Sequence, residues 1–279
     1  MKVLIIDRDR MATQFLRSKI ETAGHEIFEE AVKNNAIEVL RNNKIDLVLF
    51  DPAPLNDARP LVLGIRRTMQ SYGYVTMMSH NQTRKDAIRT GCNDILTKPL
   101  DASDLDVRLE NAKRLNELVE YMGDASIDFP SAGGIIAKSA FNQLFRSSID
   151  RADRYGEQSY MMIIKLDNYG EIMQVDGAYA AEYAISKLAQ QLTRMRRQSD
   201  IISQIGENQY VLLLQRPNDD NEPMEAAKRF AQTLEEQEDA VANGTLAPQA
   251  SIQLLDLPVG NLLFEHKLAG KGQTMQSSG

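Results

Sequence analysis

The sequence of 279 residues contains one cysteine, Cys92, no tryptophan and three histidines. A single thiol excludes an intrachain disulfide framework and is typical of a reducing compartment, so we expect a cytoplasmic protein. No apolar run approaches the roughly 20 residues that a helix needs to cross a bilayer, so we expect no membrane insertion. His25, His80 and His266 are scattered and do not have the spacing of metal ligands.

Basic residues are too few for a broad nucleic-acid surface. The chain has 32 Lys and Arg against 39 Asp and Glu, which gives a net charge of −7 and a pI near 5.2. This balance predicts that DNA is not a partner. Hydrophobic residues make up 43% and charged residues 25% of the chain, which is ordinary for a globular protein. At roughly 150 residues per domain, the length predicts two domains.

Short apolar runs alternate with helical patterns in the first half of the chain. These runs cover residues 2–6, 46–50, 74–78 and 94–96. Fully apolar strands that are connected by helices are typical of a parallel sheet covered on both faces. The first half is therefore predicted to be a doubly wound α/β domain, in which the chemistry lies at the carboxyl ends of the strands.

Polar residues stand at these predicted strand ends. They are Asp7, Asp9, Asp51, Ser79 and Lys98. Converging carboxylates can hold a hard cation through oxygen ligands. One carboxylate can then attack a phosphoryl group while the cation and the lysine neutralise the developing charge. The Ser79 hydroxyl can hydrogen-bond a phosphoryl oxygen.

The order and spacing of these residues resemble the receiver domain of two-component response regulators, over about residues 1–120. The resemblance implies a flavodoxin-like fold in which Asp51, in DLVLFD, is the phosphoacceptor. It further implies that Ser79 is the switch hydroxyl and Lys98 the phosphate partner. A sensor kinase or phosphotransfer protein is the implied phosphoryl donor, and the peptide before Pro99 is expected to be cis.

One position departs from the receiver pattern. The family usually has two adjacent acids after the first strand, and the second is a magnesium ligand; here that position is Arg8. Since a cation repels magnesium, Asp7 and Asp51 are at most weak metal ligands, and Asp9 compensates only if the loop shifts. Arg8 could instead pair with Asp51 and mimic the metal. Phosphorylation of Asp51 and a receiver fold kept for dimerisation or docking both stay open.

A segment rich in turn-forming residues separates the two halves of the chain. Residues 123–134, GDASIDFPSAGG, are the predicted linker. We expect a receiver-like domain with a C-terminal linker helix over residues 1–122, a second domain over 135–272 and a mobile tail over 273–279.

The second half is predicted to be an α+β domain. Its expected strands cover residues 160–166, 201–205, 210–214 and 250–255, with a hairpin around 206–209. Its expected helices cover residues 139–155, 178–197, 224–237 and 261–268.

Four motifs in this half resemble the diguanylate cyclase domain that is named for its GGDEF sequence. They are AGGIIAK at 132–138, KLDNY at 165–169, DIISQI at 200–205 and GENQY at 206–210. The resemblance implies a nucleotidyl-cyclase-like fold. Cyclase chemistry needs two metal ions that join two GTP molecules, and their ligands must be hard and anionic.

The ligands for those metal ions are replaced in this sequence. Lys165 stands where the family has its first metal aspartate, and Asn208 and Gln209 stand where it has the acidic pair. Three carboxylates thus become one cation and two neutral amides, which cannot hold two divalent ions. We therefore predict a degenerate GGDEF domain that is not an enzyme.

Another motif of the family is intact. Arg197 and Asp200 match its RxxD inhibitory motif, and Arg229 stands where the family often supplies a second arginine. The planar fork of arginine binds guanine or a phosphate with two bonds, and aspartate accepts from the guanine N–H groups. The resemblance implies cyclic di-GMP as the ligand of these three residues. The alternative is an Arg–Asp surface pair at the end of a helix.

Together these features predict a non-catalytic signalling effector or adaptor of the response-regulator type. It binds cyclic di-GMP at the RxxD site and acts as a homodimer through protein–protein contacts, with phosphoryl input at Asp51. A nucleotide-independent dimeric scaffold is the second hypothesis. An active diguanylate cyclase is the third.

Overall fold

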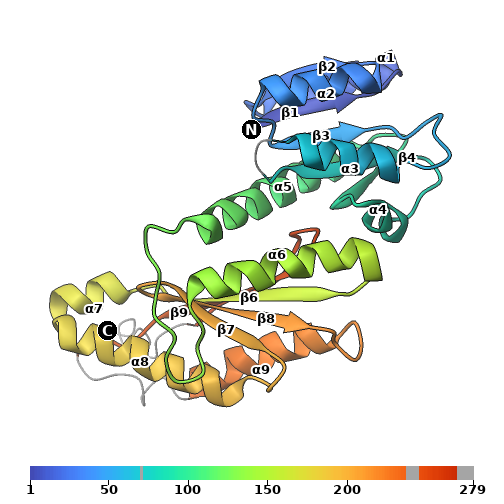
Figure 1. Cartoon of the computed structure of the whole chain (residues 1–279). Helices are drawn as coiled ribbons and strands as arrows, with labels where there is room; N and C mark the ends of the chain where they lie inside the picture. Colours follow the sequence, from blue (N-terminus) through green and yellow to red (C-terminus); the bar gives the residue numbers. More distant parts are fainter. Residues whose placement is uncertain (70–71, 237–244, 269–279) are drawn as a thin grey trace, which may run out of the picture. The chain divides into compact units, whose positions relative to one another are not determined.

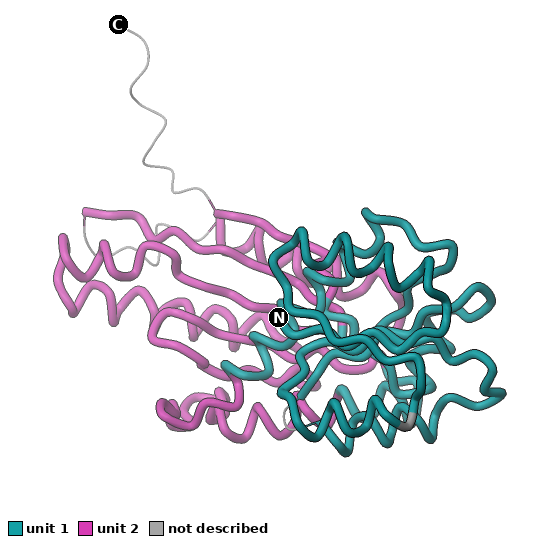
Figure 2. Tube along the Cα trace, turned by 90° about the horizontal axis from the view of Figure 1, so that it is seen from above, with its two compact units in different colours: residues 1–121, 149–157, 257–260 teal, residues 122–148, 158–256, 261–279 magenta. Residues whose placement is uncertain are grey.

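The computed structural model describes residues 1–69, 72–236 and 245–268 (Figure 1). The chain forms two compact units, which Figure 2 shows in different colours. Unit 1 consists of Met1–Tyr121, Ile149–Glu157 and Leu257–Gly260; unit 2 consists of Met122–Ser148, Gln158–Asp256 and Asn261–Gly279. The tail predicted over residues 273–279 lies outside the described residues. No described helix has the length and apolar character of a membrane span.

The first unit is built on a five-stranded parallel sheet. Its strands are β1 (Lys2–Ile6), β2 (Glu26–Glu30), β3 (Leu47–Phe50), β4 (Tyr74–Ser79) and β5 (Asp94–Thr97). The order across the sheet is β2-β1-β3-β4-β5, and every neighbouring pair is parallel. This is the flavodoxin-like order, in which the chain reverses direction between β1 and β3. The predicted doubly wound α/β fold is confirmed.

Helices cover both faces of this sheet. They are α1 (Arg10–Thr22), α2 (Lys33–Asn42), α3 (Arg59–Thr68), α4 (Arg84–Thr90) and α5 (Ala102–Gly123). Leu4 and Phe50 belong to a buried cluster with Leu40 of α2 and Val62 of α3. Val3 and Ile5 are equally buried. Because successive strand residues point to opposite faces, β1 is apolar throughout rather than alternating.

The sequence analysis missed β2, whose sequence EIFEE carries three glutamates. The strand lies at the edge of the sheet, where β1 is its one neighbour among the described strands. Charged edge strands are common because charge discourages pairing with other chains. A strand of this kind lacks the apolar run that identified the other four.

The second unit contains another five-stranded sheet, in the order β10-β9-β6-β8-β7. Its strands are β6 (Ser159–Leu166), β7 (Ile201–Gly206), β8 (Gln209–Gln215), β9 (Ala250–Leu257) and β10 (Leu262–Lys267). Its helices are α7 (Tyr169–Val175), α8 (Ala178–Met195), α9 (Glu222–Glu236) and the first part of α6 (Lys138–Tyr155), whose last residues belong to unit 1. The predicted hairpin is present as the antiparallel pair β7 and β8.

One core cluster joins this sheet to its helices. Ile164 of β6 and Leu212 of β8 pack with Leu188 of α8 and Phe230 of α9, and all four are at most 3% exposed. The predicted α+β fold of the second half is confirmed. The cluster fixes α8 and α9 on the sheet; α9 carries residues of the candidate ligand site, and others lie in the turn that follows α8.

The helix predicted over residues 261–268 is wrong, because this segment forms β10 and pairs antiparallel with β9. Gly260 adopts a positive φ of 76°, and the backbone N–H of Asn261 donates to Asp256 Oδ1 at 2.7 Å. This tight turn sends the chain back along β9. The pairing overrides the weak local preference of NLLFEHKL for a helix.

The burial of Cys92 leads to a testable prediction. Cys92 is 2% exposed, and burial raises the pKa of its thiol to about 12, against the opposing charge of Arg66. At pH 8 only about one molecule in 10⁴ then carries the reactive thiolate. We expect iodoacetamide to modify the native protein far more slowly than the protein unfolded in urea, as measured by mass spectrometry. Equal rates in both states would contradict the buried position.

Candidate functional site

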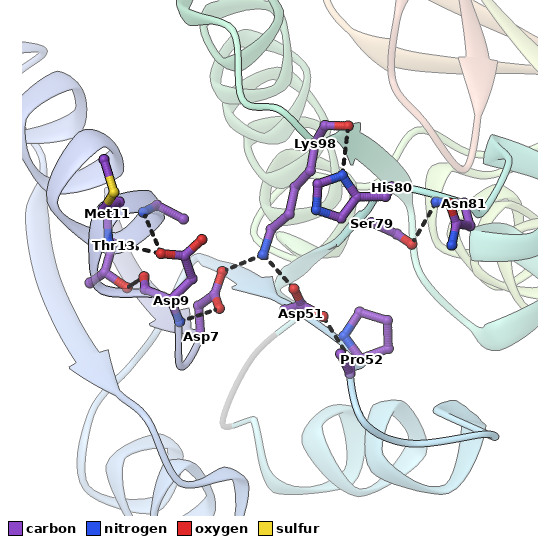
Figure 3. Close-up of polar contacts among 12 residues, drawn as sticks. Asp7, Asp9, Met11, Thr13, Asp51, Pro52, Ser79, His80, Asn81 and Lys98 are labelled. Atoms are coloured by element: carbon purple, nitrogen blue, oxygen red, sulfur yellow. Dashed lines mark hydrogen bonds and ion pairs between the residues drawn. The ribbon is translucent and has the colours of Figure 1, made fainter.

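The predicted receiver residues meet at one edge of the first sheet (Figure 3). Asp7 follows β1, Asp51 follows β3 and Lys98 follows β5. Because the carboxyl ends of parallel strands lie along the same edge, residues far apart in sequence come together there. The Lys98–Pro99 peptide is cis, as expected from the resemblance.

Lys98 joins the two buried acids of this pocket. Its Nζ donates to Asp7 Oδ2 at 2.8 Å and also to Asp51 Oδ2. The exposed fraction is 6% for the Lys98 side chain, 3% for Asp7 and 16% for Asp51. Burial acts to lower the pKa of Lys98, but the hydrogen bonds and charges of Asp51 and Asp7 outweigh it, so the pKa is raised. Lys98 therefore stays protonated and neutralises the acids.

Asp9 has a different task from that of a metal ligand. Its Oδ1 accepts from the backbone N–H groups of Met11 and Ala12, at 2.9 and 3.3 Å, and it thereby caps the N-terminus of α1. Its side chain lines a cavity of about 280 Å³ together with Asp7 and Asp51. Asp9 lies beside the pocket, and its carboxylate already has backbone partners.

Two cations line this same cavity, Arg8 and Lys33. Lys33 Nζ donates to the carbonyl oxygens of Pro52 and Ala53, at 2.8 and 2.7 Å. Burial lowers the pKa of Lys33, and the charge of Asp51 opposes that shift. The sequence analysis missed Lys33, because it begins a helix and follows no recognised strand.

The pocket does not fit magnesium. Asp7 and Asp51 are both paired with Lys98, and Arg8 lies in the adjacent loop. The described residues contain no group of three or more His, Cys, Asp or Glu arranged to hold a metal ion. Lys98, rather than Arg8, pairs with Asp51, and Arg8 forms no hydrogen bond or ion pair within the described part of the chain.

Ser79 ends β4 at the same sheet edge (Figure 3). Its Oγ accepts from the backbone N–H of Asn81 at 3.3 Å. The neighbouring His80 lies within 3.2 Å of the Lys98 carbonyl oxygen through Nδ1. Ser79 is therefore placed near the pocket without a hydrogen bond to Asp51 in the described residues.

The second sheet carries Lys165, Asn208 and Gln209, which the sequence resemblance places at the cyclase metal-ligand positions. Lys165 of β6 lies opposite Gln209 of β8 in the strand register. Asn208 Nδ2 donates to the Leu166 carbonyl oxygen at 2.8 Å. An amide can donate this hydrogen bond, whereas an ionised carboxylate only accepts. Asn208 therefore holds the turn between β7 and β8 against the end of β6. With one cation and two amides, the residues at this edge do not fit a pair of divalent ions.

The RxxD residues line a cavity of about 560 Å³ in the second unit. Arg197 and Asp200 come from the turn between α8 and β7, and Arg229 comes from α9. The structure therefore brings together the three residues that the sequence analysis assigned to one ligand. Gln215 and Arg216, at the end of β8, form another wall of the cavity.

Asp200 is held by the backbone of its own motif. Its Oδ2 accepts from the Arg197 backbone N–H at 3.0 Å, and the residue is 8% exposed. Burial raises the pKa of Asp200, although this backbone hydrogen bond and the charges of Arg197, Arg196 and Arg229 oppose it. The Asp200 carboxylate is thus fixed in position through Oδ2, and its Oδ1 takes no part in this hydrogen bond.

The guanidinium of Arg197 pairs with Glu222 rather than with Asp200. Glu222 lies in the first turn of α9, is 7% exposed and lines the same cavity. The sequence analysis missed it, because an acid in the first turn of a helix is usually explained by the helix dipole. The alternative prediction was an ion pair between the side chains of Arg197 and Asp200. The structure shows instead that the Arg197 side chain pairs with Glu222.

Comparison with known proteins identifies the type of the second domain. Residues 131–255 match the family model of the diguanylate cyclase GGDEF domain, and this range includes Lys165, Asn208 and the residues of the RxxD cavity. The second unit thus contains a domain of the GGDEF type. The search of curated proteins gave no match.

Solved structures resemble each half of the chain separately. A two-component response regulator from Clostridium difficile is 26% identical, with a TM-score of 0.37, and the match covers 41% of this chain and 96% of that one. The chemotaxis protein CheY4 of Vibrio cholerae is 18% identical, with a TM-score of 0.36 and coverage of 40% and 97%. The GGDEF domain of TpbB from Pseudomonas aeruginosa is 19% identical, with a TM-score of 0.37 and coverage of 43% and 70%. At these scores, the fold assignment rests on the strand order described above.

The Asn208 hydrogen bond generates a second prediction. We expect Asn208→Asp to lower the free energy of unfolding by about 1–3 kcal/mol at pH 7, because its carboxylate faces the Leu166 carbonyl without a proton to donate. The loss should shrink as the pH falls toward about 4, where a protonated acid can donate. Urea unfolding at both pH values measures the difference.

Gln209→Glu is the matched control. It makes the same change of charge at the next residue, whose side chain forms no hydrogen bond with a described residue. We expect it to leave the stability within about 0.5 kcal/mol of the wild type. Equal losses for both variants would assign the effect to charge and not to the hydrogen bond.

Proposed function

We propose that the chain is a non-catalytic signalling effector of the response-regulator type that binds cyclic di-GMP at Arg197, Asp200 and Arg229. The observation that carries this proposal is the single cavity lined by these three side chains. Its volume of about 560 Å³ lies within the usual range of small-molecule sites. The acid and arginines match the guanine edges and phosphates of such a ligand.

The chemistry of the cavity supports a guanine-containing anion. Arginine donates two parallel hydrogen bonds to guanine O6 and N7 or to a phosphate. Asp200 is fixed by a backbone hydrogen bond and can accept from guanine N1 and N2. Gln215 Nε2 is a buried donor without a hydrogen-bond partner in the described residues, and an acceptor on a ligand would satisfy it.

The absence of catalysis in this proposal rests on charge. Lys165 and the amides Asn208 and Gln209 stand where metal ligands are needed, and Asn208 is committed to the Leu166 carbonyl. A cation and two neutral amides do not stabilise two divalent ions beside a triphosphate. Conversion of GTP to cyclic di-GMP by the wild-type chain with magnesium would contradict this part of the proposal.

The output is proposed to be a protein–protein contact made by a homodimer. Of the two units, one has the receiver-like strand order and the other the GGDEF-type domain. A receiver-like domain can take its input from a sensor kinase or a phosphotransfer protein, and a bound nucleotide can bias a docking surface only through a difference in affinity between two states.

Isothermal titration with cyclic di-GMP tests the ligand. We expect the wild type to bind, and Arg197→Ala to weaken binding at least about tenfold, because a charged bidentate contact is lost. Arg194→Ala is the control, since Arg194 is an exposed arginine in the last turn of α8 that does not line the cavity. Absence of heat and of any thermal shift for the wild type would favour the nucleotide-independent scaffold.

A separate experiment tests phosphoryl input at Asp51. In this pocket, Lys98 and Lys33 supply positive charge beside the Asp51 carboxylate. We expect acetyl phosphate to label the wild type but not Asp51→Asn, and EDTA to change the labelling little, because the acids do not fit magnesium. Intact-mass spectrometry measures the added phosphoryl group.

Asp57→Asn is the control for this experiment, since Asp57 is an exposed acid in the loop between β3 and α3 that does not line this cavity. Its labelling should equal that of the wild type. Equal labelling of the wild type and Asp51→Asn would show that Asp51 is not the phosphoacceptor. Labelling abolished by EDTA would contradict the inference that the pocket does not use magnesium.

A further inference from the structure

The cavity proposed to bind cyclic di-GMP contains an acid of the chain itself. Glu222 places its carboxylate against the Arg197 guanidinium, inside the same cavity. Its side chain is 9% exposed, whereas that of Arg197 is 48% exposed. The arginine that a ligand phosphate or guanine edge needs is therefore already paired with an acid of the chain.

Glu222 also holds the loop between β8 and α9. Its carboxylate accepts a hydrogen bond from the backbone N–H of Asn218, and the Asn218 side-chain amide lies 3.4 Å away. The Glu222 backbone N–H donates to Asp219 Oδ1 at 3.0 Å. One side chain thus links the ligand-binding arginine to the loop over residues 216–221.

The loop contains a residue in an unfavourable backbone conformation. Arg216 has a φ of 51°, and it is the one residue other than glycine with a positive φ in the described chain. Such a conformation is unfavourable for a residue with a side chain and persists where the surrounding contacts hold it. Arg216 directly follows β8 and lines the cavity. Loss of the Glu222 contacts removes one of the restraints on this loop.

The charges of the cavity decide how Glu222 affects an anionic ligand. Three arginines, Arg197, Arg216 and Arg229, face two acids, Asp200 and Glu222. The cavity therefore has a formal charge of +1, and of +2 once the carboxylate of Glu222 is neutralised. A dianion gains from that change, because charges interact more strongly where water is partly excluded.

We propose that Glu222 is an intramolecular competitor that a ligand must displace from Arg197, and that its displacement releases the loop over residues 216–221. This inference rests on the proposed function, since it concerns the same cavity. In this proposal Glu222 regulates the site. The Glu222 carboxylate competes with the ligand for Arg197 and so lowers the affinity, and ligand binding changes the contacts of the first turn of α9.

Titration of cyclic di-GMP into Glu222→Gln tests the competition. The amide keeps the size of the side chain and removes its charge, so we expect binding about tenfold tighter than that of the wild type. Glu225→Gln is the matched control, because Glu225 is an exposed acid in the same first turn that does not line the cavity. Its affinity should stay within about twofold of the wild type.

A double-mutant cycle separates competition at Arg197 from a general effect of charge. If Glu222 acts through Arg197, Glu222→Gln gives no gain in the Arg197→Ala background. A tenfold gain in that background would overturn the proposal. So would unchanged or weaker binding by Glu222→Gln alone, and weaker binding would make Glu222 a positioning residue for Arg197.

Hydrogen exchange of residues 216–221 provides a readout that needs no ligand. Exchange of these amides should be faster in Glu222→Gln than in the wild type, and unchanged in Glu225→Gln. If Glu222→Gln has the same affinity and the same hydrogen exchange as the wild type, the competitor role of Glu222 is wrong while the proposed function stands. If neither protein binds cyclic di-GMP, the proposed ligand is wrong, and faster exchange in the variant would then show only that Glu222 restrains the loop.

Discussion

The amide of Asn208 donates a hydrogen bond to the Leu166 carbonyl oxygen, and this contact limits what the edge of the second sheet can do. An acid at this position would bring an acceptor against an acceptor unless it stayed protonated. The residue opposite the adjacent amide is Lys165, so this edge carries one cation and two neutral amides. In the proposed non-catalytic function, this lack of negative charge is part of the local structure, because Asn208 is needed as a hydrogen-bond donor.

Each candidate site of this protein is neutralised by its own side chains. In the first unit, Lys98 pairs with Asp7 and Asp51. In the second, Glu222 pairs with Arg197. A buried charge that loses its partner is costly, so the buried members of these pairs, Lys98 and Glu222, depend on their partners. In the proposed functions, a phosphoryl group or a nucleotide has to replace an internal contact, and the affinity for it is the difference between the two interactions.

Sequence patterns predicted most of the fold because apolar strands and helical periodicity are local signals. The buried strands β1, β3 and β4 were readable as continuous apolar runs, and parallel topology then required Asp7, Asp51 and Lys98 to converge. The pattern did not reveal β2, whose glutamates suit an exposed edge, or β10, whose strand pairing depends on a turn at Gly260. Both depend on tertiary position, which a local pattern does not contain.

The residues that the sequence did not identify share one property: their roles come from long-range contacts. Lys33 reaches the carbonyls of Pro52 and Ala53, and Glu222 reaches Arg197. Each stands in the first turn of a helix, where a charged residue needs no special explanation.

The two residues of the RxxD motif have different partners, and only the structure shows which partner each of them has. The RxxD spacing places Arg197 and Asp200 in one turn, and a sequence pattern suggests that they pair. In the structure, the Asp200 carboxylate accepts a hydrogen bond from the Arg197 backbone, and the Arg197 side chain pairs with Glu222. The acid of the motif is thus held by its own turn, whereas the arginine is held by a residue of α9. In the proposed function, a guanine nucleotide is recognised by the fixed acceptor Asp200 and displaces Glu222 from the donor Arg197.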